Sequence, residues 1–251
     1  MPPTFSKLDV PDLSGKVYIV TGTTSGIGKE LARILYSKSV YMAAQEEGDT
    51  IKQIKEAEPA STGTLKFLAA EKKLHVLFNN AGYMAADDRN MEETVQGCEK
   101  QLGVNCLGPF LSTKLLTLTL LATVRVVFVS SFAAEMYHEK RVGIDLDNLD
   151  YHNPKPSIHR YSLSKVVLGV PVNSRILRSN LFSQQFFRLQ VALVYHPAVK
   201  GVTDMTGYAF PFGRFRPICE DLRVARSEAE GDVDLTRRFW EWSEKKVEEF
   251  V

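Results

Sequence analysis

Short apolar runs, separated by segments of helical periodicity, recur along most of this chain. Each run has the length of a buried strand and ends at polar residues or a turn. The runs are KVYIV at 16–20, VYMAA at 40–44, HVLFN at 75–79, RVVFVS at 125–130 and QVALVY at 190–195. Between the first two, GKELARILYSKS places Leu31, Ile34 and Leu35 on one helical face. Strands that alternate with helices predict an α/β fold with a parallel, doubly wound sheet.

The composition is that of an ordinary globular protein. The chain has 251 residues, of which 44% are hydrophobic and 24% charged, with a formal net charge of +1. This balance predicts one soluble domain over residues 1–251 and gives no reason to expect a nucleic acid partner. The most apolar stretch begins at Leu115 and is interrupted by Arg125 after about ten residues, whereas a membrane span needs roughly 20. We therefore expect no membrane span.

Cysteine and histidine usage bounds the compartment and the chemistry. Cys98, Cys106 and Cys219 are odd in number and lie in unrelated contexts, which predicts free thiols and a reducing compartment. The histidines show no metal-ligand spacing, and neither HExxH nor CxxC occurs, so no metal site is expected. Residues 1–16 are polar and contain prolines where a secretory peptide needs an apolar core. We expect a cytoplasmic protein.

The turn after the first apolar run reads TGTTSGIG and opens the next helical segment. It contains Gly22, Gly26 and Gly28 at set spacing. Glycines at these places let backbone amides approach a pyrophosphate at the positive end of a helix, because a side chain would hold the phosphates away. A tight turn without a ligand is the alternative. The position between a strand and a helix favours a dinucleotide cofactor.

With this motif the sequence resembles the short-chain dehydrogenase/reductase family, whose glycine pattern is TGxxxGIG. Other motifs of that family follow in its order: NNAG at 79–82, an asparagine in GVNCLG, a second serine in VVFVSS and the Tyr-Lys pair in YSLSK. The resemblance implies a Rossmann fold and a nicotinamide cofactor. It also implies a catalytic tetrad of Asn105, Ser131, Tyr161 and Lys165.

The pattern YxxxK occurs twice, in YHNPK at 151–155 and in YSLSK at 161–165. The chemistry requires both side chains on one face of a helix. Pro154 and Pro156 disfavour a helix around Lys155, whereas YSLSK contains no such break. Tyr161 is therefore the better candidate.

Electrostatics explains why a lysine should accompany Tyr161. An ammonium about 4 Å away, in an effective dielectric near 20, favours the phenolate by about 4 kcal/mol. In the family, the tyrosine exchanges a proton with the carbonyl oxygen while hydride moves to or from the nicotinamide. The resemblance gives Ser131 a hydrogen bond to that oxygen, Lys165 a contact with the nicotinamide ribose, and Asn105 a relay water. A strand-end hydroxyl for Ser131 and a helix-bending residue for Asn105 remain the alternatives.

The cofactor contacts are also implied by the resemblance. They are Thr21, Gly22, Ser25, Gly26, Ile27, Gly28, Lys29, Gln45, Asn79, Asn80, Ala81, Gly82, Asn105, Tyr161, Lys165, Pro197 and Thr203. After the second strand, an acid binds the ribose diol of NAD and a basic residue accepts the phosphate of NADP. Here Gln45 is followed by Glu46 and Glu47. Glu46 favours NAD, whereas Lys29 could reach the phosphate, and the group described next favours NADP.

Three stretches resemble a fungal group related to retinol dehydrogenases and WW-domain oxidoreductases: RVVFVSSFAAE, GIDLDNLDYH and RFWEWSEKKVEEF. The long insertion between Ser131 and Tyr161 also matches that group. This resemblance implies an NADP-dependent oxidoreductase of lipophilic alcohols or ketones, often in secondary metabolite biosynthesis. A homodimer is possible. The aromatic residues of RFWEWSEKKVEEF could line a lid over the substrate, but docking of a terminal helix to the core is the preferred interpretation.

Two departures from the family pattern raise a second hypothesis. If TLKFL at 64–68 were the third strand, the connection to HVLFN would be shorter than a parallel crossover needs, so we expect that strand to be absent and TLKFLAAEKKL to be mainly helix. Pro171 ends or kinks the helix that should continue after Lys165. The pattern suggests lost segments. A catalytically impaired relative that binds a cofactor or a partner is therefore the alternative to an enzyme.

Overall fold

The computed structural model describes most of the chain. The described residues are 8, 10–38, 41–44, 49–62, 64–67, 74–88, 91–119, 125–140, 143–166, 190–192, 207–210, 214–217 and 235–251. The chain divides into two compact units. The first comprises Met1–Ala81, Thr117–Val129 and Phe186–Arg216, and the second comprises Gly82–Leu116, Ser130–Gln185 and Pro217–Val251. Each unit is described by itself.

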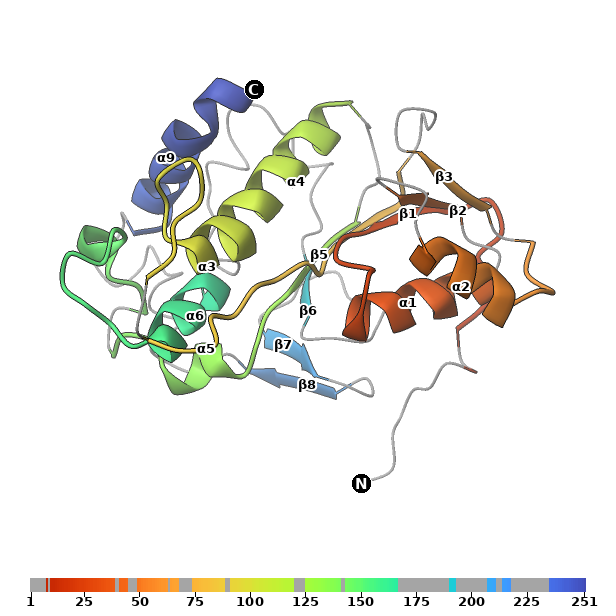
Figure 1. Ribbon diagram of the computed structural model, residues 1–251, viewed down its shortest axis with the longest axis horizontal. Helices are drawn as coiled ribbons and strands as arrows, with labels where there is room; N and C mark the ends of the chain where they lie inside the picture. Colours follow the sequence, from red (N-terminus) through yellow and green to blue (C-terminus); the bar gives the residue numbers. More distant parts are fainter. Residues whose placement is uncertain are drawn as a thin grey trace. The chain divides into compact units, whose positions relative to one another are not determined.

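The first unit is built on a sheet with the strand order β3-β2-β1-β4-β5-β6-β7-β8 (Figure 1). The strands are β1 Val17–Val20, β2 Tyr41–Ala44, β3 Thr64–Phe67, β4 Val76–Asn79, β5 Arg125–Val129, β6 Gln190–Ala192, β7 Gly207–Phe210 and β8 Arg214–Pro217. Every pairing from β3 through β7 is parallel. The predicted Rossmann-type α/β fold is confirmed.

The prediction that the third strand is absent is wrong. Residues Thr64–Phe67 form β3, which pairs in parallel with β2 over four positions, so β2 is not an edge strand. The prediction assumed that a crossover must contain a dozen residues. An extended chain reaches about 3.3–3.6 Å per residue, so the eight residues 68–75 can span about 26 Å or more. Three strand spacings and a return along one strand need only about 22 Å on the diagonal.

Helix α1, Gly26–Ser37, packs its predicted apolar face into the core of this unit. Leu31, Ala32 and Leu35 are buried, in the three-and-four spacing of one helical face. Every residue of β1 is buried as well, as expected of a central strand covered on both faces. Helix α2, Asp49–Ala57, adds Ile54 to the same cluster. Each buried leucine or isoleucine side chain of this cluster contributes about 1.5–3 kcal/mol by leaving water.

The second unit is mainly helical. Its elements are α3 Lys100–Leu102, the π-helical η3 Gly103–Leu107, α4 Gly108–Thr119 up to Leu116, α5 Ala133–Met136, the 3-10 helix η4 Leu146–Asn148, α6 Ser157–Val166, α9 Leu235–Val247 and the 3-10 helix η8 Glu248–Phe250. None of the helices in the described ranges combines the length and the apolarity that a membrane crossing requires.

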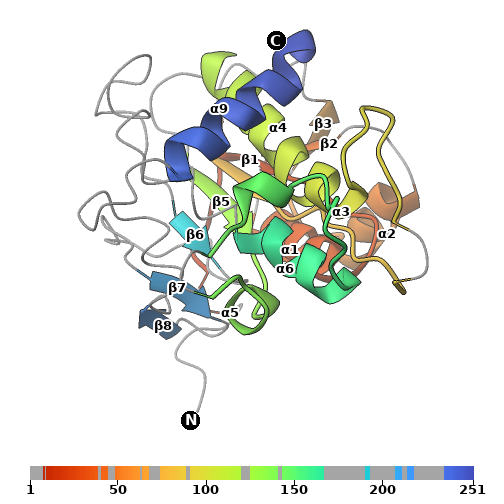
Figure 2. The ribbon, with the colours of Figure 1, turned by 90° about the vertical axis from the view of Figure 1, so that its left-hand side faces the viewer.

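The aromatic residues of α9 dock this helix against α4, which lies beside it (Figure 2). The Trp240 ring meets Phe110 edge to face with centroids 4.9 Å apart. Phe239 is fully buried and stacks on Trp242 at 5.6 Å. Lys114 of α4 also donates to Glu244 at 3.0 Å. The docking interpretation of these aromatics is confirmed.

Candidate functional site

The glycine turn follows β1 in the first unit and has the backbone that the motif predicts. Gly22 and Gly26 adopt φ of 70° and 57°, a region that residues with a Cβ rarely enter. A Cβ on Gly22 would also lie 2.7 Å from the Cα of Ala81. Gly28 is buried, and a Cβ there would overlap the Gly22 oxygen and the Asn80 amide. The sequence of this turn is therefore dictated by close backbone packing.

The NNAG motif is bonded directly to this turn. Thr21 Oγ1 accepts hydrogen bonds from the backbone N–H groups of Asn80 at 3.0 Å and Ala81 at 2.9 Å. In return, Asn80 Nδ2 donates to the Thr21 oxygen at 2.9 Å and to the Gly22 oxygen at 3.2 Å. Two motifs about 60 residues apart thus form one bonded structure at the ends of two neighbouring strands. Asn79 is buried beneath them.

The turn fits the pyrophosphate of a dinucleotide. The N-cap of α1 is Ser25, whose side chain makes no capping hydrogen bond, so the first amides of the helix have no side-chain acceptor at this cap. The turn is exposed from Gly22 to Ile27 except for half-buried Thr23. Uncapped amides at the positive end of a helix are a suitable site for an anion. These residues therefore fit a nicotinamide dinucleotide.

Other predicted cofactor contacts have varied surroundings. The Lys29 ammonium donates to the side-chain oxygen of Gln53 on α2. Gly82, the last residue of NNAG, is exposed. Gln45, with Glu46 and Glu47, lies outside the described residues. The same holds for Pro197 and Thr203. Across the described ranges, no group of three or more His, Cys, Asp or Glu could hold a metal ion.

Tyr161 and Lys165 lie one turn apart on α6 in the second unit. The Lys165 side chain is buried, and its Nζ lies 5.7 Å from the centre of the Tyr161 ring. Burial removes water from the ammonium and lowers the pKa of Lys165 to about 8. The positive charge is therefore held close to the phenol at neutral pH and is lost as the pH rises through about 8.

The competing pair is arranged differently. Tyr151 precedes α6, has φ of 55° and is buried. Lys155 also precedes α6, and its Nζ donates to Glu139 at 2.7 Å. The expectation that only YSLSK forms a helical turn is confirmed, and the two prolines account for the difference.

Ser131 follows β5 at the start of the second unit. Its Oγ accepts a hydrogen bond at 3.2 Å from the N–H of Ala133, the first residue of the short helix α5. The neighbouring Ser130 is buried, and its Oγ donates to the Lys165 oxygen at 3.0 Å. Ser162 donates to the Ala133 oxygen at 2.9 Å. Ser131 and the turn of Lys165 are thereby linked through α5 and Ser130, a residue that the motif alone did not single out.

Asn105 is fully buried in η3, where a π-helical turn interrupts the helix. Its Oδ1 accepts from the Tyr83 N–H at 2.7 Å, and its Nδ2 donates to the Tyr83 oxygen at 2.8 Å. The same Nδ2 donates to Ser164 Oγ at 2.9 Å, and Ser164 Oγ donates to the Tyr161 oxygen at 2.7 Å. Both amide protons of Asn105 are therefore used, one at the Tyr83 oxygen and the other at Ser164 of α6. The sequence motif identified Asn105 but gave no indication of Ser164.

The parallel sheet and the glycine turn at the end of β1 define a Rossmann-type dinucleotide-binding fold. Residues 16–142 match the short chain dehydrogenase family. A short-chain dehydrogenase/reductase of Phomopsis amygdali is 36% identical over 319 aligned positions, which cover 99% of this chain and 94% of the relative. The chain belongs to the short-chain dehydrogenase/reductase family, and it is an oxidoreductase of that family.

Other comparisons agree with this assignment. The short-chain dehydrogenase/reductase bet4 of Neocamarosporium betae is 36% identical and covers 99% of this chain and 91% of the relative. Human retinol dehydrogenase 12 is 39% identical over 144 residues, or 48% of this chain and 45% of the relative. An uncharacterised protein of Mycobacterium Paratuberculosis has a solved structure that matches 98% of both chains with a TM-score of 0.68 at 23% identity, which shows a shared fold.

The alignment with the Phomopsis relative also bears on the lost segments. Its 319 positions exceed the 251 residues of this chain, so the relative has residues at many positions where this chain has none. Because the alignment covers 99% of this chain, the missing positions fall between its aligned residues. This agrees with the expectation of lost segments.

Proposed function

We propose that this protein is an NADP-dependent oxidoreductase that transfers hydride between the nicotinamide and a lipophilic alcohol or ketone. The observation that carries the proposal is the pairing of Tyr161 with the buried ammonium of Lys165 on one turn of α6. Family membership supports the reaction class. The choice of NADP, the lipophilic substrate and a role in secondary metabolite biosynthesis rest on the resemblance to the fungal group. The proposed cytoplasmic location rests on the cysteine usage.

The proton is handled by Tyr161 in this proposal. In the reducing direction its hydroxyl donates to the substrate carbonyl oxygen, and in the oxidising direction the phenolate accepts the alcohol proton. The Lys165 ammonium, 5.7 Å from the ring centre, is proposed to attract the negative charge that develops on the phenol oxygen as the proton leaves. Lys165 therefore lowers the cost of losing the proton at the moment of transfer.

Ser131 and Asn105 are proposed to support this step. Ser131 Oγ uses its lone pair at the Ala133 N–H, and its own hydrogen remains available to the substrate oxygen. Asn105 acts at a distance, because its side chain holds the Tyr83 backbone and Ser164. The cofactor would be held by the amides of the glycine turn, and when bound it supplies the hydride.

The test is a comparison of cofactor binding with turnover. Purified protein is titrated with NADPH and with NADH by fluorescence, and turnover of a panel of apolar ketones is measured. We expect tighter binding of NADPH than of NADH, and turnover that Tyr161→Phe abolishes. Tyr151→Phe is the matched control, because Tyr151 belongs to the other YxxxK pair and lies outside α6; it should retain turnover.

Three results would contradict the proposal in whole or in part. Tight cofactor binding without any Tyr161-dependent turnover would favour the non-catalytic alternative that the sequence left open. Failure to bind either dinucleotide would exclude both the enzyme and the cofactor-binding module. Equal affinity for NADPH and NADH would remove the NADP assignment while leaving the reaction class intact.

A further inference from the structure

Two amide side chains, Gln101 and Asn105, lie four residues apart along α3 and η3, and both are fully buried. Each connects the same two segments of the second unit. One segment is the chain after NNAG, residues 83–85, and the other is α6. Asn105 is a motif residue of the family, whereas nothing in the sequence drew attention to Gln101.

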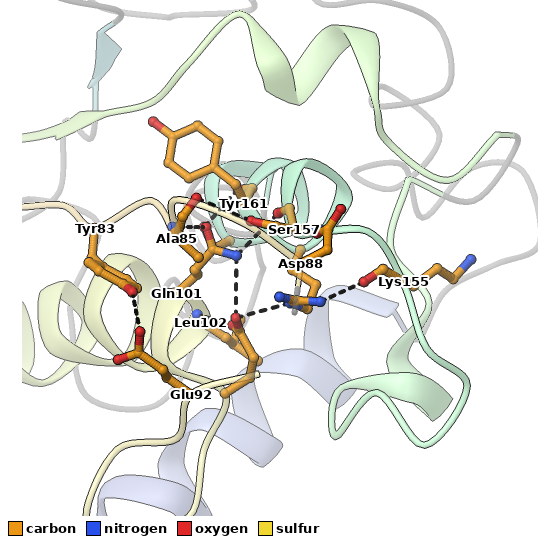
Figure 3. Close-up of polar contacts among 12 residues, drawn as sticks. Tyr83, Ala85, Asp88, Glu92, Gln101, Leu102, Lys155, Ser157 and Tyr161 are labelled. Atoms are coloured by element: carbon orange, nitrogen blue, oxygen red, sulfur yellow. Dashed lines mark hydrogen bonds and ion pairs between the residues drawn. The ribbon is translucent and has the colours of Figure 1, made fainter. Parts of the chain in front are cut away.

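Gln101 uses both the oxygen and the nitrogen of its side-chain amide in this connection (Figure 3). Its Oε1 accepts from the Ala85 N–H at 3.1 Å, and its Nε2 donates to the Ser157 oxygen at 3.1 Å. Ser157 lies four residues before Tyr161, so its carbonyl is the one that an α-helix pairs with the Tyr161 N–H. Gln101 therefore holds α6 one turn before Tyr161.

Asn105 holds the same helix after Tyr161. Its Nδ2 donates to Ser164 Oγ at 2.9 Å, and that hydroxyl donates to the Tyr161 oxygen at 2.7 Å. At its other end it holds the Tyr83 backbone, two residues from the Ala85 amide that Gln101 binds. The turn that carries Tyr161 is thus held on both sides from one helix. The Tyr161 ring points away from the Gln101 contacts (Figure 3).

The orientation of the Gln101 amide is fixed by a buried ion pair. Its Nε2 donates to Glu99 Oε1 at 3.3 Å, and Arg160 Nε reaches the same oxygen at 3.3 Å. Glu99 also accepts from the Leu102 N–H at 2.8 Å, and both charged side chains are buried. If the amide were rotated by half a turn, its oxygen would face the Ser157 oxygen and the Glu99 carboxylate. Only one orientation satisfies all these partners.

We propose that Gln101 is a positioning residue for Tyr161, acting together with Asn105 to fix the turn of α6 that bears Tyr161 and Lys165. The inference rests on the proposed function for its effect on turnover. Its effect on α6 itself is independent of any reaction. Loss of the Gln101 contacts should loosen the first turn of α6 and displace the phenol, and displacement by about 1 Å is enough to cost about a hundredfold in rate.

The test uses Gln101→Met, which removes both ends of the connection at similar volume, and Gln101→Glu, which keeps the acceptor for Ala85. The matched control is Glu92→Gln. Glu92 contacts Tyr83 and Lys100 at the exposed side of the same loop. Amide hydrogen exchange of the peptide 157–166 and the kinetic constants are measured for all variants. We expect amide exchange in that peptide to be about tenfold faster than in wild type, or more, for both Gln101 variants. Glu92→Gln should exchange at the wild-type rate.

On turnover, both Gln101 variants should lose about tenfold or more in kcat, with the KM for the cofactor within about twofold of wild type. The deficit of Gln101→Glu should shrink from pH 8 to pH 6, because a protonated carboxyl can again donate to the Ser157 oxygen. The inference would be overturned if the Gln101 variants matched Glu92→Gln both in kcat and in the exchange rate of peptide 157–166. If wild type itself shows no Tyr161-dependent turnover, the proposed function fails, and the exchange data alone decide the role of Gln101.

Discussion

Replacement of Lys165 by Met should abolish turnover and at the same time stabilise the folded protein at neutral pH. Burial lowers the pKa of Lys165 from its ordinary value of 10.5 to about 8, so the folded state disfavours the charged form that the unfolded chain adopts. Each pKa unit corresponds to about 1.36 kcal/mol. The buried ammonium therefore costs about 3 kcal/mol of stability below pH 8, which a methionine of similar shape removes.

The pH dependence gives this prediction its sign. Between pH 8 and 10.5 the unfolded chain binds more protons at this site than the folded protein does, so wild-type stability rises with pH over that interval. At pH 9.5 the wild-type protein should have regained about 2 kcal/mol of the stability that the buried ammonium costs at lower pH. Urea unfolding of wild type and Lys165→Met at pH 6.5 and 9.5 measures this difference. If Lys165→Met gains no stability at pH 6.5, or gains the same amount at both pH values, the reasoning is refuted.

Three further predictions address other parts of the chain. Gly28→Ala should weaken NADPH binding by about tenfold or more in a fluorescence titration, since its Cβ would overlap the Gly22 oxygen and the Asn80 amide; Gly108→Ala, whose Cβ would lie 3.6 Å from its nearest neighbour, is the control and should bind normally. Tyr151→Phe should keep or raise the urea midpoint, by up to about 1 kcal/mol in stability, because the Tyr151 hydroxyl is buried with no hydrogen-bond partner among the described residues; a large loss would reveal a partner. Phe239→Ala should lower stability by about 3–5 kcal/mol, because this fully buried ring stacks on Trp242; a loss below 1 kcal/mol would show that α9 is not needed for the core.

The strands could be predicted from sequence because their signal is local. VYIV is apolar throughout, and VLFN is apolar except for its last residue. Each forms a strand in which every residue is buried. The length of the connection to β4 gives no such local signal for the third strand, because a short extended connection can still reach across the sheet. The four pairs that β3 makes with β2 are long-range contacts, and no local pattern reports them.

The residues of the candidate site also divide into those that a local sequence pattern reveals and those that it does not. Motifs identified Tyr161, Lys165 and Asn105, because the family pattern specifies residue types at fixed spacing. The residues that hold them, among them Ser130 and Gln101, act through backbone groups of distant segments. A serine or glutamine that binds a carbonyl carries no sequence signature, because any carbonyl in reach will serve as partner. Such contacts become visible only when the fold brings the segments together.

The same contacts bear on Pro171, the proline that follows Tyr161 and Lys165 in sequence. Pro171 lies outside the described residues, which include α6 as far as Val166. In an α-helix, a proline ring clashes with the carbonyl four residues earlier, and for Pro171 that position lies beyond Lys165. The bonds that hold Tyr161 and Lys165 come from Gln101 and Asn105 before this point, and from Ser130, which binds the Lys165 oxygen. None of them requires the helix to continue. We infer that the turn bearing Tyr161 and Lys165 is determined by residues preceding it in sequence. Pro171→Ala should therefore leave amide hydrogen exchange in peptide 157–166 unchanged. Faster or slower exchange there would show that the segment after Val166 also shapes the turn.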